Sequence, residues 1–516
     1  MTRRFFGRLA DHLRQSLGAP GAAARLYFSA YWAYAGSFCL LGACLAFAQP
    51  LLSVPDELTH WQQSHLQMEK AIHAKKCIET VTVMAMAQPH APPPVPIVSF
   101  APLQCGVSPD AYSDAFTYPG VVASKLILPN QTESVVRQVQ AIALARLLQG
   151  LMVLGCLLRL GALARAANRP GVLLVAAFTL SPLFAQQSFG VSADGSQLAH
   201  ALMLSACILF LERMTGWDLL LFILTGWGAS AKPFLLPCFV PSLFIGHWLS
   251  ELRRDPGVSL ADVARGFVSA LDPRRGQLRG WLIWAALVFS CLPILRALHV
   301  MQVSQTETPT LRPGGIVDQA AQLRLVLGAP WRLLSLDIAE YAEPWRLQNL
   351  AGPLGWLDVD VSRAVVGGYR RTLLLGAALE GAFLIAARHG SLREVRQRLV
   401  RAISPSLIGI VAGACSVAAI ALVLYMGETA VGETLIQGVQ ARYFLPTWVL
   451  AIALLSGSVS LGLGTEWAPR APSAVVAPPA QARVRTVAAF VLVVLVLWTT
   501  LPLIARLFVD LAERYG

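Results

Sequence analysis

Apolar runs long enough to cross a lipid bilayer recur from one end of this chain to the other. A helix needs about 20 consecutive apolar residues to span the hydrocarbon core. The chain has 516 residues and is 55% hydrophobic but only 14% charged. We therefore expect an all-α polytopic membrane protein with one large intramembrane domain. The clearest runs are 27–49, 172–189, 281–300, 403–425, 443–463 and 487–508.

The net charge of +12 indicates membrane topology and does not indicate a nucleic-acid partner. Arginine is concentrated in short connecting segments, as it is in the cytoplasmic loops of membrane proteins. We take these segments as cytoplasmic and in contact with membrane lipid headgroups. They are 3–14, 159–169, 253–279, 388–401 and 470–485.

With this orientation the sequence predicts about eleven spans. Residues 171–189 are expected to form one of them, and Pro233 predicts a reversal at Ala231-Lys232-Pro233, because proline disfavours helix at the residue before it. Amphipathic stretches at 55–75 and 320–338 are expected to lie on the membrane surface. The expected organisation is a cytoplasmic N-terminus (1–26), a transmembrane module (27–463) with external loops at about 52–134 and 301–370, a cytoplasmic linker (464–485), and a last helix with an external C-terminus (486–516).

Two of the nine cysteines, Cys77 and Cys105, fall in the first external loop, while the others lie in or beside apolar segments. A disulfide between these two requires that the loop face an oxidising compartment.

Polar residues gather at the expected external ends of the helices. They are Asp56, Glu57 and His60 after the first span, then Asp194, then Lys232, and finally Gln440, Arg442 and Tyr443. Ionisable groups at membrane depth are costly and tend to be functional. A carboxylate can take a proton from an acceptor hydroxyl, and Lys or Arg can bind a phosphate. The pattern favours group transfer from a lipid phosphate carrier.

Each of these residues also has a structural reading. Asp56 and Glu57 after Pro55 suit the first turn of a helix, and His60 can simply hydrogen-bond to Asp56. Asp194 can cap a helix, and Lys232 can extend to lipid headgroups. The pair Arg442-Tyr443 can anchor a helix at the interface. The acidic pair Asp358 and Asp360 is set aside, since no nucleotide-binding domain surrounds it.

Several short motifs resemble those of a large bacterial family of polytopic membrane proteins long labelled as of unknown function. These motifs are Pro55-Asp56-Glu57 with His60-Trp61, Tyr118-Pro119, Ser181-Pro182 through Gln186-Gln187, Ser192-Ala193-Asp194-Gly195, Lys232-Pro233, and Gln440-Ala441-Arg442-Tyr443. Many members have glycine where this chain has Ala441. The family in turn looks like the GT-C superfamily of membrane glycosyltransferases.

The resemblance implies a GT-C-like bundle of about 11 transmembrane helices, with interfacial helices in both long external loops. It implies inverting transfer of a sugar from a polyprenyl-phosphate donor to a cell-envelope glycan, glycolipid or protein, on the periplasmic side of the bacterial inner membrane. Asp56 or Glu57 would be the general base, Asp56 being favoured. His60, Tyr118, Asp194, Lys232, Gln440, Arg442 and Tyr443 would bind substrate. A divalent metal such as Mg²⁺ or Mn²⁺ is left open, and so are two rival functions: a transporter or flippase of lipid-linked saccharides, and a non-catalytic scaffold.

Overall fold

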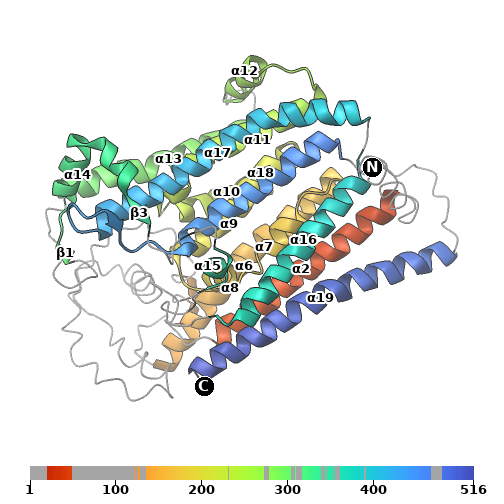
Figure 1. Ribbon diagram of the computed structural model, residues 1–516, viewed down its shortest axis with the longest axis horizontal. Coiled ribbons are helices and arrows are strands. Elements are labelled where there is room, and N and C mark those ends of the chain that lie inside the picture. The colour runs from red at the N-terminus through yellow and green to blue at the C-terminus, as the bar shows by residue number, and fades with distance from the viewer. Residues whose placement is uncertain are drawn as a thin grey trace.

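The protein is a helical bundle in the computed structural model, which describes residues 20–48, 135–230, 232–271, 278–303, 316–338, 346–352, 361–388, 391–465 and 479–515 and a few shorter pieces between them (Figure 1). The α-helices are α2 (Pro20–Ala48), α6 (Val135–Ala167), α7 (Leu173–Phe178), α8 (Pro182–Ser188), α9 (Ala193–Phe210), α10 (Gly216–Ala229), α11 (Leu236–Arg254), α12 (Leu260–Ala270), α13 (Leu278–Val303), α14 (Gln319–Gly328), α15 (Leu347–Ala351), α16 (Arg363–Ala386), α17 (Leu392–Glu428), α18 (Leu445–Leu463) and α19 (Pro479–Tyr515). Short 3₁₀ turns occupy η2 (Leu211–Arg213), η3 (Pro233–Leu235), η5 (Pro330–Ser335) and η7 (Ala441–Phe444).

Six of the described helices are long and apolar enough to cross a membrane: α2, α6, α9, α17, α18 and α19. Two shorter apolar helices, over 216–229 and 278–291, coincide with further spans expected from the sequence. The all-helical, multi-pass membrane class is therefore confirmed, whereas the total of about eleven spans stays a prediction.

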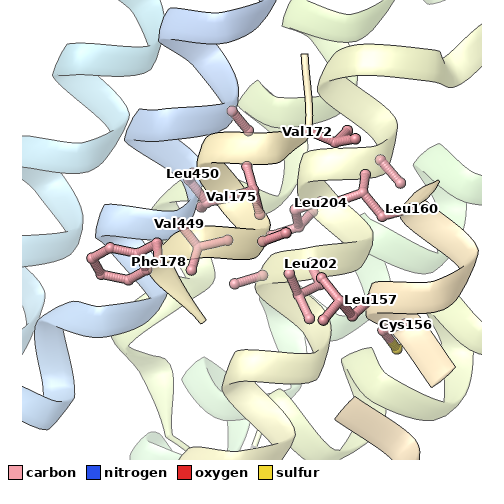
Figure 2. Packing of buried hydrophobic residues seen from close by; sticks show 14 of the residues in the cluster. Cys156, Leu157, Leu160, Val172, Val175, Phe178, Leu202, Leu204, Val449 and Leu450 are labelled. Carbon is pink, nitrogen blue, oxygen red and sulfur yellow. The ribbon is translucent and has the colours of Figure 1, made fainter. Parts of the chain in front are cut away.

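Helix α9 is the centre of the bundle. Every one of its residues is buried, as expected for a helix that is surrounded by other helices. Figure 2 shows part of this core, in which Leu202 and Leu204 of α9 pack among side chains of α6, α7 and α18. By contrast, α17 and α19 leave most of their apolar surface exposed, which suits contact with lipid. Helix α19 lies beside α2, so the first and last described helices are neighbours (Figure 1).

The two ends of α9 have different chemistry. Near its last turn, Glu212 lies 2.6 Å from Arg169 and 4.0 Å from Arg253, so the Arg-rich segments meet at this end, which we call the basic end. Asp194 lies in its first turn, about 27 Å away at 1.5 Å per residue. Helices α2, α17 and α19 run toward the end that carries Asp194, and α16 and α18 run away from it (Figure 1). We call this second end the site end.

The single helix expected over 171–189 is wrong, because the structure has two short helices there. Ser181 caps α8 by accepting a hydrogen bond from the Phe184 N–H at 3.2 Å, and Pro182 follows as its first residue. At the start of α7, the Tyr27 hydroxyl accepts from the Val172 N–H at 2.7 Å and Glu380 accepts from the Leu173 N–H at 2.7 Å. These side chains supply partners for backbone groups that a helix start leaves unpaired.

Three other boundaries differ from expectation. Helix α17 begins at Leu392, so most of the arginines expected in the connecting segment 388–401 lie on its first turns: Arg393, Arg396, Arg398 and Arg401. The amphipathic stretch 320–338 divides into α14, η5 and a two-residue strand β3 (Asp337–Ile338). That strand pairs in parallel with β4 (Leu435–Ile436), while β1 (Thr308–Pro309) pairs antiparallel with β2 (Ile316–Val317). Finally, α19 begins at Pro479, within the expected linker.

Candidate functional site

Asp194 lies in the first turn of α9 but does not cap it. The cap is Ser192, whose hydroxyl accepts from the Asp194 N–H at 3.1 Å. The Asp194 carboxylate is consequently available for other partners. It is 2% exposed, and a carboxylate at that burial needs a charge partner or several hydrogen bonds.

Lys232 supplies the first partner. It lies in the break between α10 and η3, confirming the reversal expected there. Its Nζ is 2.7 Å from Oδ1 of Asp194, and its backbone carbonyl accepts from Nε2 of Gln197 at 2.8 Å. Gln197 is one turn beyond Asp194 on α9, so the same helix binds both the backbone and the side chain of Lys232. The lysine is 4% exposed and does not reach out to headgroups.

Arg442 supplies the second partner from η7, just before α18. Its Nε lies 3.3 Å from Oδ2 of Asp194, and its Nη2 donates to the Tyr443 hydroxyl at 3.2 Å. The Tyr443 ring is 5.1 Å from both Lys232 Nζ and Arg442 Cζ, within the range of a cation–π contact. Phe234 packs on the same ring at 5.2 Å. We call Asp194, Lys232, Arg442 and Tyr443 the charged cluster.

Within the described part of the chain, the charged cluster brings two cations and one carboxylate into contact. All three charged side chains are at most 5% exposed. A lysine and an arginine that converge in this way suit a phosphate group, because its oxygens can accept hydrogen bonds from both side chains. Both carboxylate oxygens of Asp194 already face cations, so a divalent metal bound there would first have to separate these pairs.

Gln440 immediately precedes η7 and is half-buried. Its Oε1 has no hydrogen-bond partner among the described residues. The next residue, Ala441, departs from the glycine common in the resembling family. Within the described chain the one non-glycine residue with positive φ is Asn168, so the backbone at Ala441 does not need glycine.

Two buried polar side chains toward the site end, those of Arg146 and Gln149, were not predicted from the sequence. Arg146 lies in the middle of an apolar stretch of α6, is 1% exposed, and donates from Nη1 to the Ala46 carbonyl at 3.0 Å, near the end of α2. An arginine inside an apolar run is itself a signal of function. Gln149, one turn further on α6, donates to the Ser196 hydroxyl at 3.4 Å. Buried polar groups therefore continue from the charged cluster across α9 to α6 and α2.

The structure thus brings together Asp194, Lys232, Arg442 and Tyr443, with Gln440 beside them in sequence. Four other predicted site residues, Asp56, Glu57, His60 and Tyr118, lie outside the described residues, as do Cys77 and Cys105. Among the residues that are described, no group of three or more His, Cys, Asp or Glu side chains is arranged to hold a metal ion.

Comparison with known proteins gives one match. Neither a curated protein nor a solved structure matches the chain significantly. A family model described as "Predicted membrane protein (DUF2142)" matches residues 116–451. The matched region includes Tyr118 and the whole charged cluster, and it begins after Asp56, Glu57 and His60. Because the match covers more than half of the sequence, this chain belongs to the DUF2142 family of predicted membrane proteins.

Proposed function

We infer that this protein is a membrane glycosyltransferase that takes a sugar from a polyprenyl-phosphate donor. The observation that supports this most directly is the convergence of two buried cations, Lys232 and Arg442, on the first turn of α9. A phosphodiester is an anion whose oxygens can accept hydrogen bonds from both of these side chains. The sequence resemblance to GT-C glycosyltransferases points to the same class of donor.

In this proposal Lys232 and Arg442 bind the donor phosphate. Their attachment to α9 through Asp194 keeps them in position before the donor arrives. Preorganised cations are more effective than mobile ones, because little reorganisation is needed when charge develops. Tyr443 packs against both cations and limits their movement. The polyprenyl tail would lie between the lipid-exposed helices.

The reaction moves one proton and one sugar. Asp56, or alternatively Glu57, takes the proton from an acceptor hydroxyl, and the hydroxyl oxygen forms a bond to the anomeric carbon of the donor. The bond between that carbon and the phosphate oxygen breaks, and its electron pair leaves with polyprenyl phosphate. The leaving phosphate gains negative charge, which Lys232 and Arg442 stabilise. The acceptor is a cell-envelope glycan, a glycolipid or a protein.

The site end faces the periplasm in this proposal. The basic end, with Arg169 and Arg253 around Glu212, corresponds to the cytoplasmic side by the positive-inside rule. A lipid-linked donor suits a periplasmic site, since soluble sugar nucleotides are absent from that compartment.

The proposal is tested with purified protein in liposomes. Polyprenyl-phosphate hexoses serve as donors, and an envelope lipid extract serves as acceptor. Appearance of free polyprenyl phosphate together with a new glycosylated product is expected. Movement of the intact sugar lipid between leaflets, with no cleavage of the sugar–phosphate bond, would instead identify a flippase. If the parent protein causes neither cleavage nor movement, and Lys232→Met behaves in the same way, the non-catalytic scaffold remains as the function.

A further inference from the structure

Two consecutive glutamines at the end of α8, Gln186 and Gln187, are buried without full hydrogen bonding. They are 1% and 0% exposed. Both amide atoms of Gln186, and Nε2 of Gln187, have no hydrogen-bond partner among the described residues. Buried amides in native proteins are nearly always bonded. Two incompletely bonded amides on consecutive residues therefore indicate that a polar ligand supplies the partners.

Gln187 is linked to the charged cluster through Ser192. Oε1 of Gln187 accepts from the Ser192 hydroxyl at 3.4 Å, and the same hydroxyl accepts from the Asp194 N–H. A Cβ placed on Gly195 would come within 2.7 Å of the Gln187 carbonyl oxygen, so α8 and the first turn of α9 touch directly. Helix α8 also contacts η7, which carries Arg442.

A glutamine with a purely structural role looks different in this chain. Gln322 on α14 is 0% exposed, but its Nε2 donates to the Tyr425 carbonyl at 3.2 Å and its Oε1 accepts from the Gly432 N–H at 3.1 Å. Burial alone therefore does not leave glutamine amides unbonded in this protein.

We propose that Gln186 and Gln187 bind hydroxyl groups of the donor sugar, while Lys232 and Arg442 bind its phosphate. This inference rests on the proposed function and deepens it, by assigning the sugar half of the donor to α8. A sugar hydroxyl both donates and accepts a hydrogen bond, and so does an amide, through Nε2 and Oε1. Because amides are uncharged, they recognise the sugar without changing the charge balance at the phosphate.

The consequence is selectivity for a loaded carrier over an empty one. A bare polyprenyl phosphate satisfies the cations but leaves the amides without partners, which weakens its binding relative to the sugar-carrying lipid.

The test compares the affinities of detergent-solubilised protein for two kinds of lipid: polyprenyl monophosphate, and the same lipid carrying glucose, galactose or mannose. The quantity measured is the ratio of the affinities, which does not depend on the fraction of protein that is folded. The variants are Gln186→Met and Gln187→Met, which keep side-chain length and remove the amide. Gln322→Met is the matched control.

For the parent protein we expect at least one sugar lipid to bind about tenfold more tightly than the bare phosphate, as a few hydrogen bonds allow. Loss of that preference in Gln186→Met or Gln187→Met, with bare phosphate binding retained and Gln322→Met unchanged, supports the proposal. An unchanged ratio in both α8 variants overturns it and leaves the proposed function standing. If the parent protein binds neither lipid, the proposed function fails and this inference fails with it.

Discussion

Nζ of Lys232 lies 2.7 Å from Oδ1 of Asp194, so the break between α10 and α11 is attached to the first turn of α9. This pair connects the central helix of the bundle to the point where the chain reverses. Arg442 reaches the other oxygen of the same carboxylate at 3.3 Å and attaches α18 to the same place. One buried carboxylate therefore fixes the relative positions of three helix ends.

Removing the lysine charge is expected to affect both stability and donor binding. In Lys232→Met, Asp194 loses the nearer of its two described cationic partners, and breaking one side of a buried ion pair costs about 3 kcal/mol of unfolding free energy. Thermal unfolding in detergent measures that loss, and polyprenyl phosphate affinity should fall with it. Arg265→Ala is the control, because its ion pair with Asp262 is exposed to solvent and such pairs contribute little to stability. Equal losses in both variants would contradict this account.

Neutralising the carboxylate is expected to change which anion is preferred. In Asp194→Asn, Lys232 and Arg442 lose the carboxylate that they share, so the net charge of the charged cluster becomes more positive by one. Polyprenyl diphosphate should then gain affinity relative to polyprenyl monophosphate by about tenfold, which corresponds to about 1.4 kcal/mol. Gln197→Met is on the same helix but alters no charge, so it should leave the ratio of diphosphate to monophosphate affinity unchanged. A ratio that stays constant in Asp194→Asn as well would show that charge balance does not select the donor.

Removing the general base is expected to lower the rate of glycan transfer and to leave donor binding nearly unchanged. Of Asp56→Asn and Glu57→Gln, at least one should lower glycan transfer by about 10²–10⁴-fold, the usual contribution of a positioned acid or base. Affinity for the donor should remain within a few-fold of the parent protein, since Lys232 and Arg442 are intact. Full transfer activity in both variants would end the general-base assignment.

The helices and the cluster were predictable to different degrees. Lengths of apolar sequence and the placement of arginine locate most spans, because a bilayer has fixed thickness and orientation follows basic loops. The same reasoning puts Asp194, Lys232 and Arg442 at one end, since each occupies a helix terminus. Their contact depends on how the helices pack, and no local signal in the sequence specifies packing.

The break within 171–189 shows why helix boundaries inside a membrane cannot be predicted from a short stretch of sequence alone. Residues 172–180 are almost uniformly apolar and look continuous with residues 182–185. The start of α7 is bonded to Glu380, 207 residues away from Leu173 along the chain, and no window of sequence contains both. Ser181-Pro182 was nevertheless a readable helix start, because serine at the cap and proline at the first position are typical of one.

The contact between Glu380 and Tyr27 is expected to be structural. Tyr27 donates to Oε2 of Glu380 at 3.1 Å while accepting from the Gly171 and Val172 N–H groups. Glu380→Leu should therefore cost about 3 kcal/mol of unfolding free energy, since it leaves buried donors unpaired. Tyr27→Phe and Glu380→Leu together should cost less than the sum of the two, by at least about 1 kcal/mol, because the residues share one network. Strict additivity in a double-mutant cycle would refute the shared network, and the lipid affinity ratios should not change in either variant.

Gly195 is expected to be required for the approach of α8 to α9. A Cβ there would lie 2.5 Å from Nε2 of Gln149 and 2.7 Å from the Gln187 carbonyl oxygen. The Gln149 side chain can rotate away, but the backbone oxygen cannot move without shifting α8. Gly195→Ala should therefore lower the unfolding temperature and reduce the preference for a sugar-carrying lipid, because Gln187 would be displaced from Asp194. Gly36 on α2 has nothing within 4 Å of the same added atom, so Gly36→Ala should be neutral or stabilising by up to about 1 kcal/mol through helix propensity. If the two substitutions behave alike, the close packing of α8 on α9 is not what holds Gln187 beside the charged cluster.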